Sequence, residues 1–270
     1  MRKFYTYGNP VPIGSQVQKF AHLSVDDCLF WKDLIASQDA YTSAFEQPNL
    51  AFYKRMHDQY GICITLNCFC TSGDYSISNV PSKFAEEFQA NAHWLRFAFH
   101  AEAASVRYGA AYMEDPAASA AASYNAFVAA MKTMTGTYDC IDRITRLGYY
   151  VGDEDVCLAL RDCDCGIVGL LAADDERISY YLSADDAHWL AKHPFFTDGN
   201  RLTFFRTQPR LENQADPAYL QNAQYANYDK CLELFTHEGV VTDEVFEAYC
   251  QWCCDNGYTF AFMQDVLGLY

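Results

Sequence analysis

The feature that most constrains the fold of this chain is a regular alternation of short apolar runs with longer amphipathic stretches, which begins at Ala21. Each short run is largely apolar rather than strictly alternating, as expected for parallel strands that are covered on both faces. The runs of this kind are His22–Val25, Ile62–Phe69, Leu95–Phe99, Ile144–Tyr150, Ile167–Ala172, Leu202–Phe205 and Leu232–Thr236. The pattern predicts parallel strands joined by crossover helices.

The stretches between these runs carry apolar residues three and four positions apart, which is the spacing of helices with one buried face. The predicted helices are Asn49–Tyr60, Pro81–His93, Ala117–Met134, Glu154–Arg161, Ala184–Lys192, Pro217–Cys231 and Asp243–Asn256. Thr242 can cap the helix that follows it, and Gly61 and Gly136 suit helix ends. The fold class is therefore α/β, and we expect a (β/α)7-type deformed parallel barrel.

Nothing in the sequence divides the chain into two units. A barrel of this kind commonly needs about 250 residues. The chain has 270 residues and contains no Pro/Gly/Ser-rich linker, low-complexity tract or internal repeat. We predict a single barrel domain over residues 21–270, preceded by an N-terminal extension over residues 1–20.

Charge and apolar content exclude two classes of partner. The formal net charge is −16 and no run of Lys and Arg interrupts it, so we expect no nucleic acid partner. No stretch approaches the roughly 20 apolar residues that a spanning helix needs, so we expect a soluble chain with no membrane partner. The N-terminal residues lack the apolar run of a secretory signal, and many of the 12 cysteines lie in apolar runs. These features indicate a cytoplasmic protein with reduced thiols, and they leave its oligomeric state open.

The first predicted strand ends in an acidic pair, Asp26-Asp27. Reactive groups of parallel barrels lie at the C-terminal ends of the strands. Neighbouring strand residues point to opposite sides, so only one of the pair should face inward unless the strand has already turned. One carboxylate could bind a cation while the other takes a proton from water. The alternative is that the pair caps the next helix, and the local sequence leaves both interpretations open.

Two other strands end in titratable groups. His100 follows the third apolar run, with Glu102 two positions later, and His237 follows the seventh. Histidine suits a general acid or base because its unperturbed pKa lies near neutrality. One such histidine is more often structural than functional. Three strands of one barrel that all end in such groups favour a shared site.

The segments LSVDD, FHAE and LFTHE, in this order and at these strand ends, resemble the polysaccharide deacetylase (NodB-homology) family. The resemblance extends over the chain from about residue 20. It implies that Asp26 is the general base and that Asp27 is a metal ligand. It implies further that His100 is the first histidine of an H-x-x-x-H metal motif and that His237 is the general acid. The resemblance also implies that Arg146 is the arginine that orients the base.

The chain departs from that motif at position 104, where the second histidine is expected and Ala104 is found. Glu102 could supply the missing ligand, or Ser105 a weak hydroxyl contact. The implied cofactor is a divalent metal, with zinc as the first candidate. It would be held weakly if only Asp27 and His100 bind it.

The implied reaction is hydrolysis of an N- or O-acetyl group from a carbohydrate or another small acylated substrate. Tyr108 and Tyr149 are candidate surfaces for a sugar ring, and Arg206 is a candidate for a substrate carboxylate. The alternatives, which the sequence favours, are packing for the tyrosines and an ion pair with Glu212 for Arg206.

Two other classes of function stay open on the sequence. The absence of a histidine at Ala104 is compatible with a degenerate barrel that binds carbohydrate without hydrolysing it. Cys28, next to the acidic pair, could be the nucleophile of a different hydrolase, although no base is visibly assigned to it.

Overall fold

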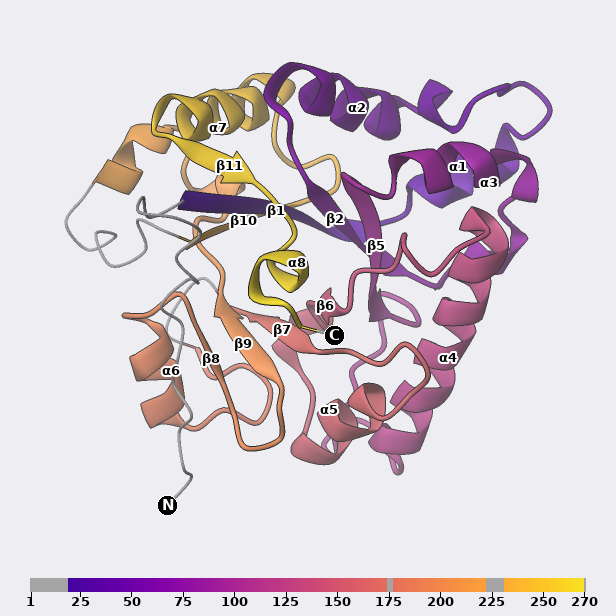
Figure 1. Cartoon of the computed structure of the whole chain (residues 1–270). Helices are drawn as coiled ribbons and strands as arrows, with labels where there is room; N and C mark the ends of the chain where they lie inside the picture. The colour runs from indigo at the N-terminus through magenta and orange to yellow at the C-terminus, as the bar shows by residue number, and fades with distance from the viewer. Residues whose placement is uncertain (1–18, 174–176, 222–230, 270) are drawn as a thin grey trace.

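The computed structural model describes residues 19–173, 177–221 and 231–269. In these residues each predicted strand position is occupied by a parallel strand at the centre of the molecule (Figure 1). The central strands are β1 (Lys19–Cys28), β2 (Ile64–Phe69), β5 (Leu95–Ala101), β6 (Ile144–Thr145), β7 (Gly169–Ala172), β9 (Thr203–Arg206) and β10 (Cys231–His237). Shorter strands are β3 (Thr71–Ser72), β4 (Tyr75–Ser76), β8 (Phe195–Thr197) and β11 (Tyr258–Phe260).

The central strands form two sheets that meet along two seams. The first sheet has the order β10-β1-β2-β5, with β11 paired to the start of β1, and the second has the order β6-β7-β9-β8. One parallel bridge, Phe97 to Ile141, joins the sheets on one side, and a second, Arg210 to Phe235, joins them on the other. These bridges close the ring, which confirms the predicted deformed parallel barrel in a single domain.

The helices follow one another around the outside of the strands (Figure 1). They are α1 (Phe30–Ala36), α2 (Pro48–Tyr60), α3 (Ala85–Asn91), α4 (Pro116–Thr135), α5 (Glu154–Arg161), α6 (Ala184–Leu190), α7 (Asp243–Asp255) and α8 (Met263–Leu267). Short 3₁₀ helices are Ala44–Glu46, Ile77–Asn79, Ser82–Phe84, Gly148–Tyr150, Leu211–Asn213 and Pro217–Gln221. Two predicted helix boundaries are confirmed. Gly61 ends α2 in a left-handed conformation, and the Thr242 side chain caps the start of α7 by accepting from the Val245 N–H.

Two predicted elements are wrong in part. The run Ile144–Tyr150 is a strand only over Ile144–Thr145, and its last residues form a 3₁₀ turn in which Tyr149 and Tyr150 both have φ of 59°, a conformation that a strand does not adopt. The predicted helix Pro217–Cys231 begins as a 3₁₀ helix, and Cys231 is instead the first residue of β10. The intervening residues 222–230, like residues 1–18 of the predicted extension, lie outside the described part of the chain.

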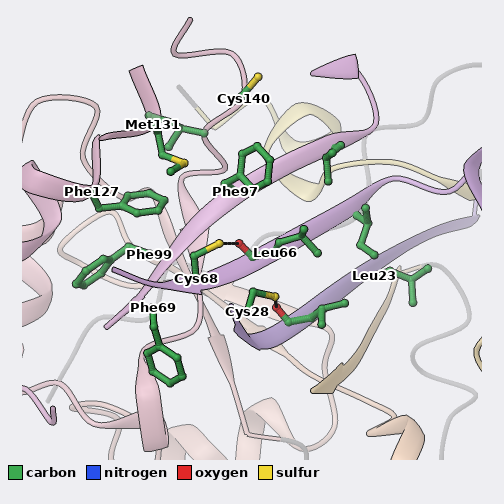
Figure 2. Packing of buried hydrophobic residues seen from close by; sticks show 14 of the residues in the cluster. Leu23, Cys28, Leu66, Cys68, Phe69, Phe97, Phe99, Phe127, Met131 and Cys140 are labelled. Carbon is green, nitrogen blue, oxygen red and sulfur yellow. Dashed lines mark hydrogen bonds between the residues drawn. The ribbon is translucent and has the colours of Figure 1, made fainter. Parts of the chain in front are cut away.

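The outer faces of the first sheet make the main apolar core. Leu23 of β1, Leu66 of β2 and Phe97 of β5 belong to one buried cluster with residues of the surrounding helices. Figure 2 shows these side chains, with Phe127 and Met131 of α4 close to the β5 phenylalanines. Because side chains alternate along a strand, the intervening residues of β1 point into the barrel.

The interior of the barrel holds a buried polar network around His22. One ring nitrogen, Nδ1, lies 2.8 Å from the Glu233 carboxylate, and the other, Nε2, lies 2.9 Å from the Thr65 hydroxyl. Thr65 donates its own hydrogen to the Asp142 carboxylate in a short bond, so Nε2 must donate as well. Burial alone would lower the pKa of His22, but Glu233 and Asp142 outweigh it and raise this pKa above 6.5. His22 is therefore an imidazolium between two buried carboxylates.

The end of the barrel at the strand N-termini is closed by apolar side chains. Phe20, Ile144, Leu171, Phe205 and Met263 of α8 form a second buried cluster there. The polar network lies between this apolar cluster and the C-terminal ends of the strands. The open end of the barrel is therefore the end at which the strands finish. Within the described residues no helix is long and apolar enough to cross a membrane. All the cysteines are free thiols.

Candidate active site

A cleft opens at the C-terminal ends of the central strands, and it contains most of the predicted site residues. Those that line it are Asp26, Asp27, His100, Arg146, Tyr149 and His237. They come from β1, β5 and β10 and from the segment after β6. The structure therefore brings together residues that are as far as 211 positions apart in the sequence, the separation of Asp26 and His237.

Both members of the acidic pair reach this cleft because β1 bends between them. Asp26 is 2% exposed and faces the barrel interior. The pairing of β1 with β2 shifts register between Val25 and Cys28, and Asp27 at the bend has φ of 59°. Aspartate is one of the few residues that adopts this left-handed conformation readily. The bend turns the half-exposed Asp27 side chain back toward His100.

The interpretation of this pair as a helix cap is wrong. Helix α1 begins at Phe30, and its N-cap Leu29 has no side-chain cap. The Leu29 N–H instead donates to Glu238 Oε2 at 2.6 Å, and the Asn49 amide donates to Glu238 Oε1 at 3.0 Å. Burial raises the pKa of Glu238. Glu238 thus links the start of α1 to the end of β10. The acidic pair does not cap this helix and faces the cleft.

Asp26 is held by a buried arginine. Arg146 Nη1 lies 2.7 Å from Asp26 Oδ1 and 3.1 Å from the Ser24 hydroxyl, and Nη2 donates to the Thr207 hydroxyl at 2.8 Å. Asn67 Nδ2 also donates to Asp26 Oδ1, at 2.9 Å. Burial would lower the pKa of Arg146, but the charge of Asp26 and its neighbours raises it. Among the described residues no donor reaches the second carboxylate oxygen, Oδ2, so it can accept from a molecule in the cleft.

Asp27 and His100 form the second pair in the cleft. His100 Nε2 lies 3.2 Å from Asp27 Oδ1. The other ring nitrogen, Nδ1, lies 2.5 Å from the Arg146 carbonyl oxygen, which can only accept, so Nδ1 carries a proton. The hydrogen bond with His100 lowers the pKa of Asp27. His100 Nε2 therefore faces, at 3.2 Å, a carboxylate whose pKa is lowered.

The expectation that Glu102 supplies a missing metal ligand is not met. Ala104 lines the cleft with a methyl group, as the sequence implied. The Glu102 carboxylate instead accepts from the Ser123 hydroxyl at 3.2 Å and lines a separate groove beside α4. Ser105 does not line the cleft either. In the described ranges of the chain, no group of three or more His, Cys, Asp or Glu residues could hold a metal ion.

His237 is paired with a residue that the sequence did not assign to it. Its Nδ1 makes a very short hydrogen bond with Glu212 Oε1. This hydrogen bond raises the pKa of His237, with further contributions from the charges of Asp26 and Asp27. Burial of Glu212 opposes its ionisation, but the bond to His237 and others outweigh burial and lower its pKa. No described residue bonds to Nε2, which leaves that nitrogen available in the cleft.

The three predicted substrate-binding residues are in different situations. Tyr108 is buried, and its hydroxyl accepts from the Glu102 N–H at 3.0 Å, so it packs at the end of β5 rather than in the cleft. Arg206 donates to Gln208 Oε1 at 2.7 Å and lines a separate small cavity. Tyr149 lines the cleft, is 58% exposed, and carries the Arg107 guanidinium 3.9 Å from its ring centre. Tyr149 is thus the predicted surface that substrate can reach.

The structure argues against Cys28 as a nucleophile. Its side chain is fully buried on the outer face of β1 and its thiol donates to the Val25 carbonyl at 3.2 Å (Figure 2). Burial raises the pKa of Cys28 well above its ordinary value, whereas a nucleophilic cysteine needs its thiolate form.

No family model matches the sequence, and no curated protein matches it. Solved structures match it in fold. A protein from Mycobacterium smegmatis assigned as a polysaccharide deacetylase superposes with a TM-score of 0.58 at 11% identity, over 99% of this chain and 95% of that one. A family 4 acetyl xylan esterase from Clostridium thermocellum, in complex with a cobalt ion, gives 0.53 at 13% identity, over 93% and 91%.

The Xyl-CE4 domain of a multidomain xylanase from the hindgut metagenome of Trinervitermes trinervoides gives a TM-score of 0.51 at 13% identity, over 93% of this chain and 90% of that one. This chain has the fold of these deacetylases and esterases. The resemblance that the sequence motifs indicated is therefore confirmed at the level of the deacetylase-type barrel, over nearly the whole chain.

Proposed function

We propose that this chain is a hydrolase that removes N- or O-acetyl groups from a carbohydrate. The observation that carries the proposal is the convergence of Asp26, His237 and the Asp27–His100 pair in one cleft of a deacetylase-type barrel. A carboxylate held by a buried arginine and an imidazole with a raised pKa are a matched base and acid.

The roles follow from the state of each group. Asp26 Oδ2 accepts a proton from a water molecule as the oxygen of that water attacks the acyl carbon. His237, as the imidazolium, then donates its Nε2 proton to the departing amine or alcohol, and acetate is released. Glu212 stabilises the positive charge of His237 until that transfer, and Arg146 orients Asp26.

The Asp27–His100 pair has the geometry of two ligands of one cation. Ligands at about 2.1 Å from a cation lie about 3.0–3.4 Å apart for octahedral to tetrahedral angles. The observed separation of Asp27 Oδ1 and His100 Nε2 is 3.2 Å. When bound, a divalent cation there supplies polarisation of the acyl oxygen. Since Ala104 offers no ligand, the chain would supply only these two side chains, and we expect weaker binding than at a three-ligand site.

The test is release of acetate from N-acetylated and O-acetylated oligosaccharides, with and without added Zn²⁺ or Co²⁺, by the wild-type chain and by His237→Gln. We expect His237→Gln to release acetate about 10²–10⁴-fold more slowly, the range of a general acid. Chelator should reduce the wild-type rate. Separately, Asp27→Asn should weaken cation binding measured by calorimetry. Binding of oligosaccharide with no acetate release by any form would instead establish the non-catalytic alternative.

Glu212→Gln is expected to move the alkaline limb of the pH–rate profile to lower pH. The imidazolium of His237 is the proton donor, and its pKa is raised chiefly by the bond to Glu212. Activity is therefore lost as pH rises through that pKa, and the loss should begin earlier when the carboxylate is removed. The control is Glu247→Gln, a carboxylate bonded to Tyr60 on the surface. An alkaline limb that stays in place in Glu212→Gln would contradict the assigned pairing.

A further inference from the structure

Exposed aromatic side chains lead from the cleft onto the turn that follows β5. Tyr149 lines the cleft and is 58% exposed, whereas Tyr112, 56% exposed, is not among the described residues that line it. The half-buried Arg107 joins the two, because its guanidinium lies 3.9 Å from the centre of the Tyr149 ring and 5.5 Å from that of Tyr112. Tyr149, Arg107 and Tyr112 thus form a continuous aromatic strip that begins in the cleft and ends outside it.

Backbone contacts hold together the two segments that carry the aromatic strip. Tyr108 and Gly152 make a parallel bridge, and the Ala110 N–H donates to Asp153 Oδ2 at 2.7 Å. The turn after β5 is therefore fixed against the segment that follows Tyr149. A surface that is ordered before a ligand arrives loses less conformational freedom on binding.

The strip combines apolar faces with hydrogen-bond donors. Arg107 makes no hydrogen bond or ion pair with any residue that the structure describes. Stacking on a ring uses the flat face of a guanidinium, and the N–H groups lie at its edge. A tyrosine ring offers a large rigid contact area that loses little rotamer freedom on binding. A sugar ring has the matching features, an apolar C–H face and hydroxyl oxygens around its edge.

We propose that Arg107 and Tyr112 bind a sugar unit next to the one that is deacetylated, at a position outside the cleft. This inference rests on the proposed function for the nature of the ligand. The neighbouring sugar covers the Tyr112 ring with its apolar face, and its hydroxyl oxygens accept from the Arg107 N–H groups, while Tyr149 contacts the sugar in the cleft. Arg107 and Tyr112 are then specificity residues for the neighbouring sugar, distinct from the groups that carry out hydrolysis.

The test compares single sugars with longer ligands, namely N-acetylglucosamine, acetylated xylose and the β-1,4-linked oligomers of each. Calorimetry gives the affinities in a His237→Gln background, in which hydrolysis is slow, with and without Tyr112→Ala or Arg107→Gln. For one of the two series we expect oligomers to bind more tightly than the single sugar. Tyr112→Ala should weaken oligomer binding about tenfold and Arg107→Gln about fivefold, as for a buried aromatic contact and one hydrogen bond. Both should leave the affinity for the single sugar within about twofold.

The chain offers a matched control for each substitution. Tyr138 is 52% exposed, carries Lys132 Nζ 4.7 Å from its ring centre, and is not among the described lining residues, so Tyr138→Ala should leave all affinities unchanged. Arg55 lies 5.0 Å from the centre of the Phe52 ring on the surface, so Arg55→Gln should also have no effect. Circular dichroism checks that every variant is folded.

The outcomes separate this proposal from the proposed function. An oligomer affinity that either Tyr112→Ala or Arg107→Gln leaves unchanged, or no binding of any ligand, overturns the proposal. Tighter oligomer binding that both substitutions remove, without acetate release when His237 is intact, retains this proposal and removes the proposed function. Acetate release that is equally fast from single sugars and oligomers, and unchanged in Tyr112→Ala, retains the proposed function and overturns this proposal.

Discussion

Asp26→Asn is expected to lower kcat for acetate release by about 10²–10⁴-fold, because the asparagine amide cannot take a proton from the attacking water. The second consequence is structural. Arg146 is 1% exposed, and the substitution leaves its charge without the carboxylate that lies 2.7 Å away. Removing one partner of a buried ion pair costs about 3–5 kcal/mol of stability. The rate must therefore be measured where circular dichroism shows the variant to be folded.

Asp142→Asn separates the two effects. Asp142 is a second buried carboxylate of the barrel interior, where it accepts from Thr65 and from the Ile144 N–H, but it does not line the cleft. We expect it to lose stability as Asp26→Asn does and to keep its kcat in the folded state. A similar fall in kcat for both variants would mean that Asp26 acts through stability and not as a base.

His22→Leu is expected to lower the free energy of unfolding by about 3–5 kcal/mol, because Glu233 and Asp142 would keep buried charge without the imidazolium between them. Urea denaturation measures this loss. The pKa of His22 is raised in the folded chain above its ordinary 6.5. The stability that this raised pKa contributes is fully present below about pH 6.5 and is lost as pH rises through the folded-state pKa. The difference between wild type and variant should therefore shrink at alkaline pH.

The double variant His22→Leu/Glu233→Leu is the control for this prediction. It removes the carboxylate that lies 2.8 Å from the ring, so it should lose less stability than the sum of the two single variants. Additive losses, or a difference from wild type that grows with pH, would show that His22 is not the cation of the network.

The sequence was sufficient to predict the barrel because the strands of the barrel are apolar on their outer faces. Runs such as Ile62–Phe69 need only their composition to be recognised, and each has a parallel strand in the structure. The strand ends then placed Asp26, His100 and His237 at one rim, since all the parallel strands of a barrel end on the same side. A closer look at alternate positions would have found Asn67 as well, because Thr65 and Asn67 are polar residues two apart in an otherwise apolar run.

The rest depended on backbone details and long-range contacts that the sequence does not show. The left-handed Asp27 reverses the direction that simple alternation gives to its side chain. The pairing of His237 with Glu212 joins β10 to a 3₁₀ helix after β9, and the sequence instead favoured Glu212 as a partner of Arg206. Glu102 comes directly after β5, and its carboxylate bonds to Ser123 of α4 instead of joining His100.

The residues of the cleft come from both sheets, on either side of the two seams. Asp26, His100 and His237 belong to one sheet, whereas Arg146 and Glu212 lie on the other side of the seams. Hydrogen bonds therefore also join the two sheets of the ring. They connect Asp26 and His100 to Arg146, and His237 to Glu212. The same contacts close the barrel and position the groups of the proposed site, so parting of the two halves at a seam would separate Asp26 from Arg146 and His237 from Glu212.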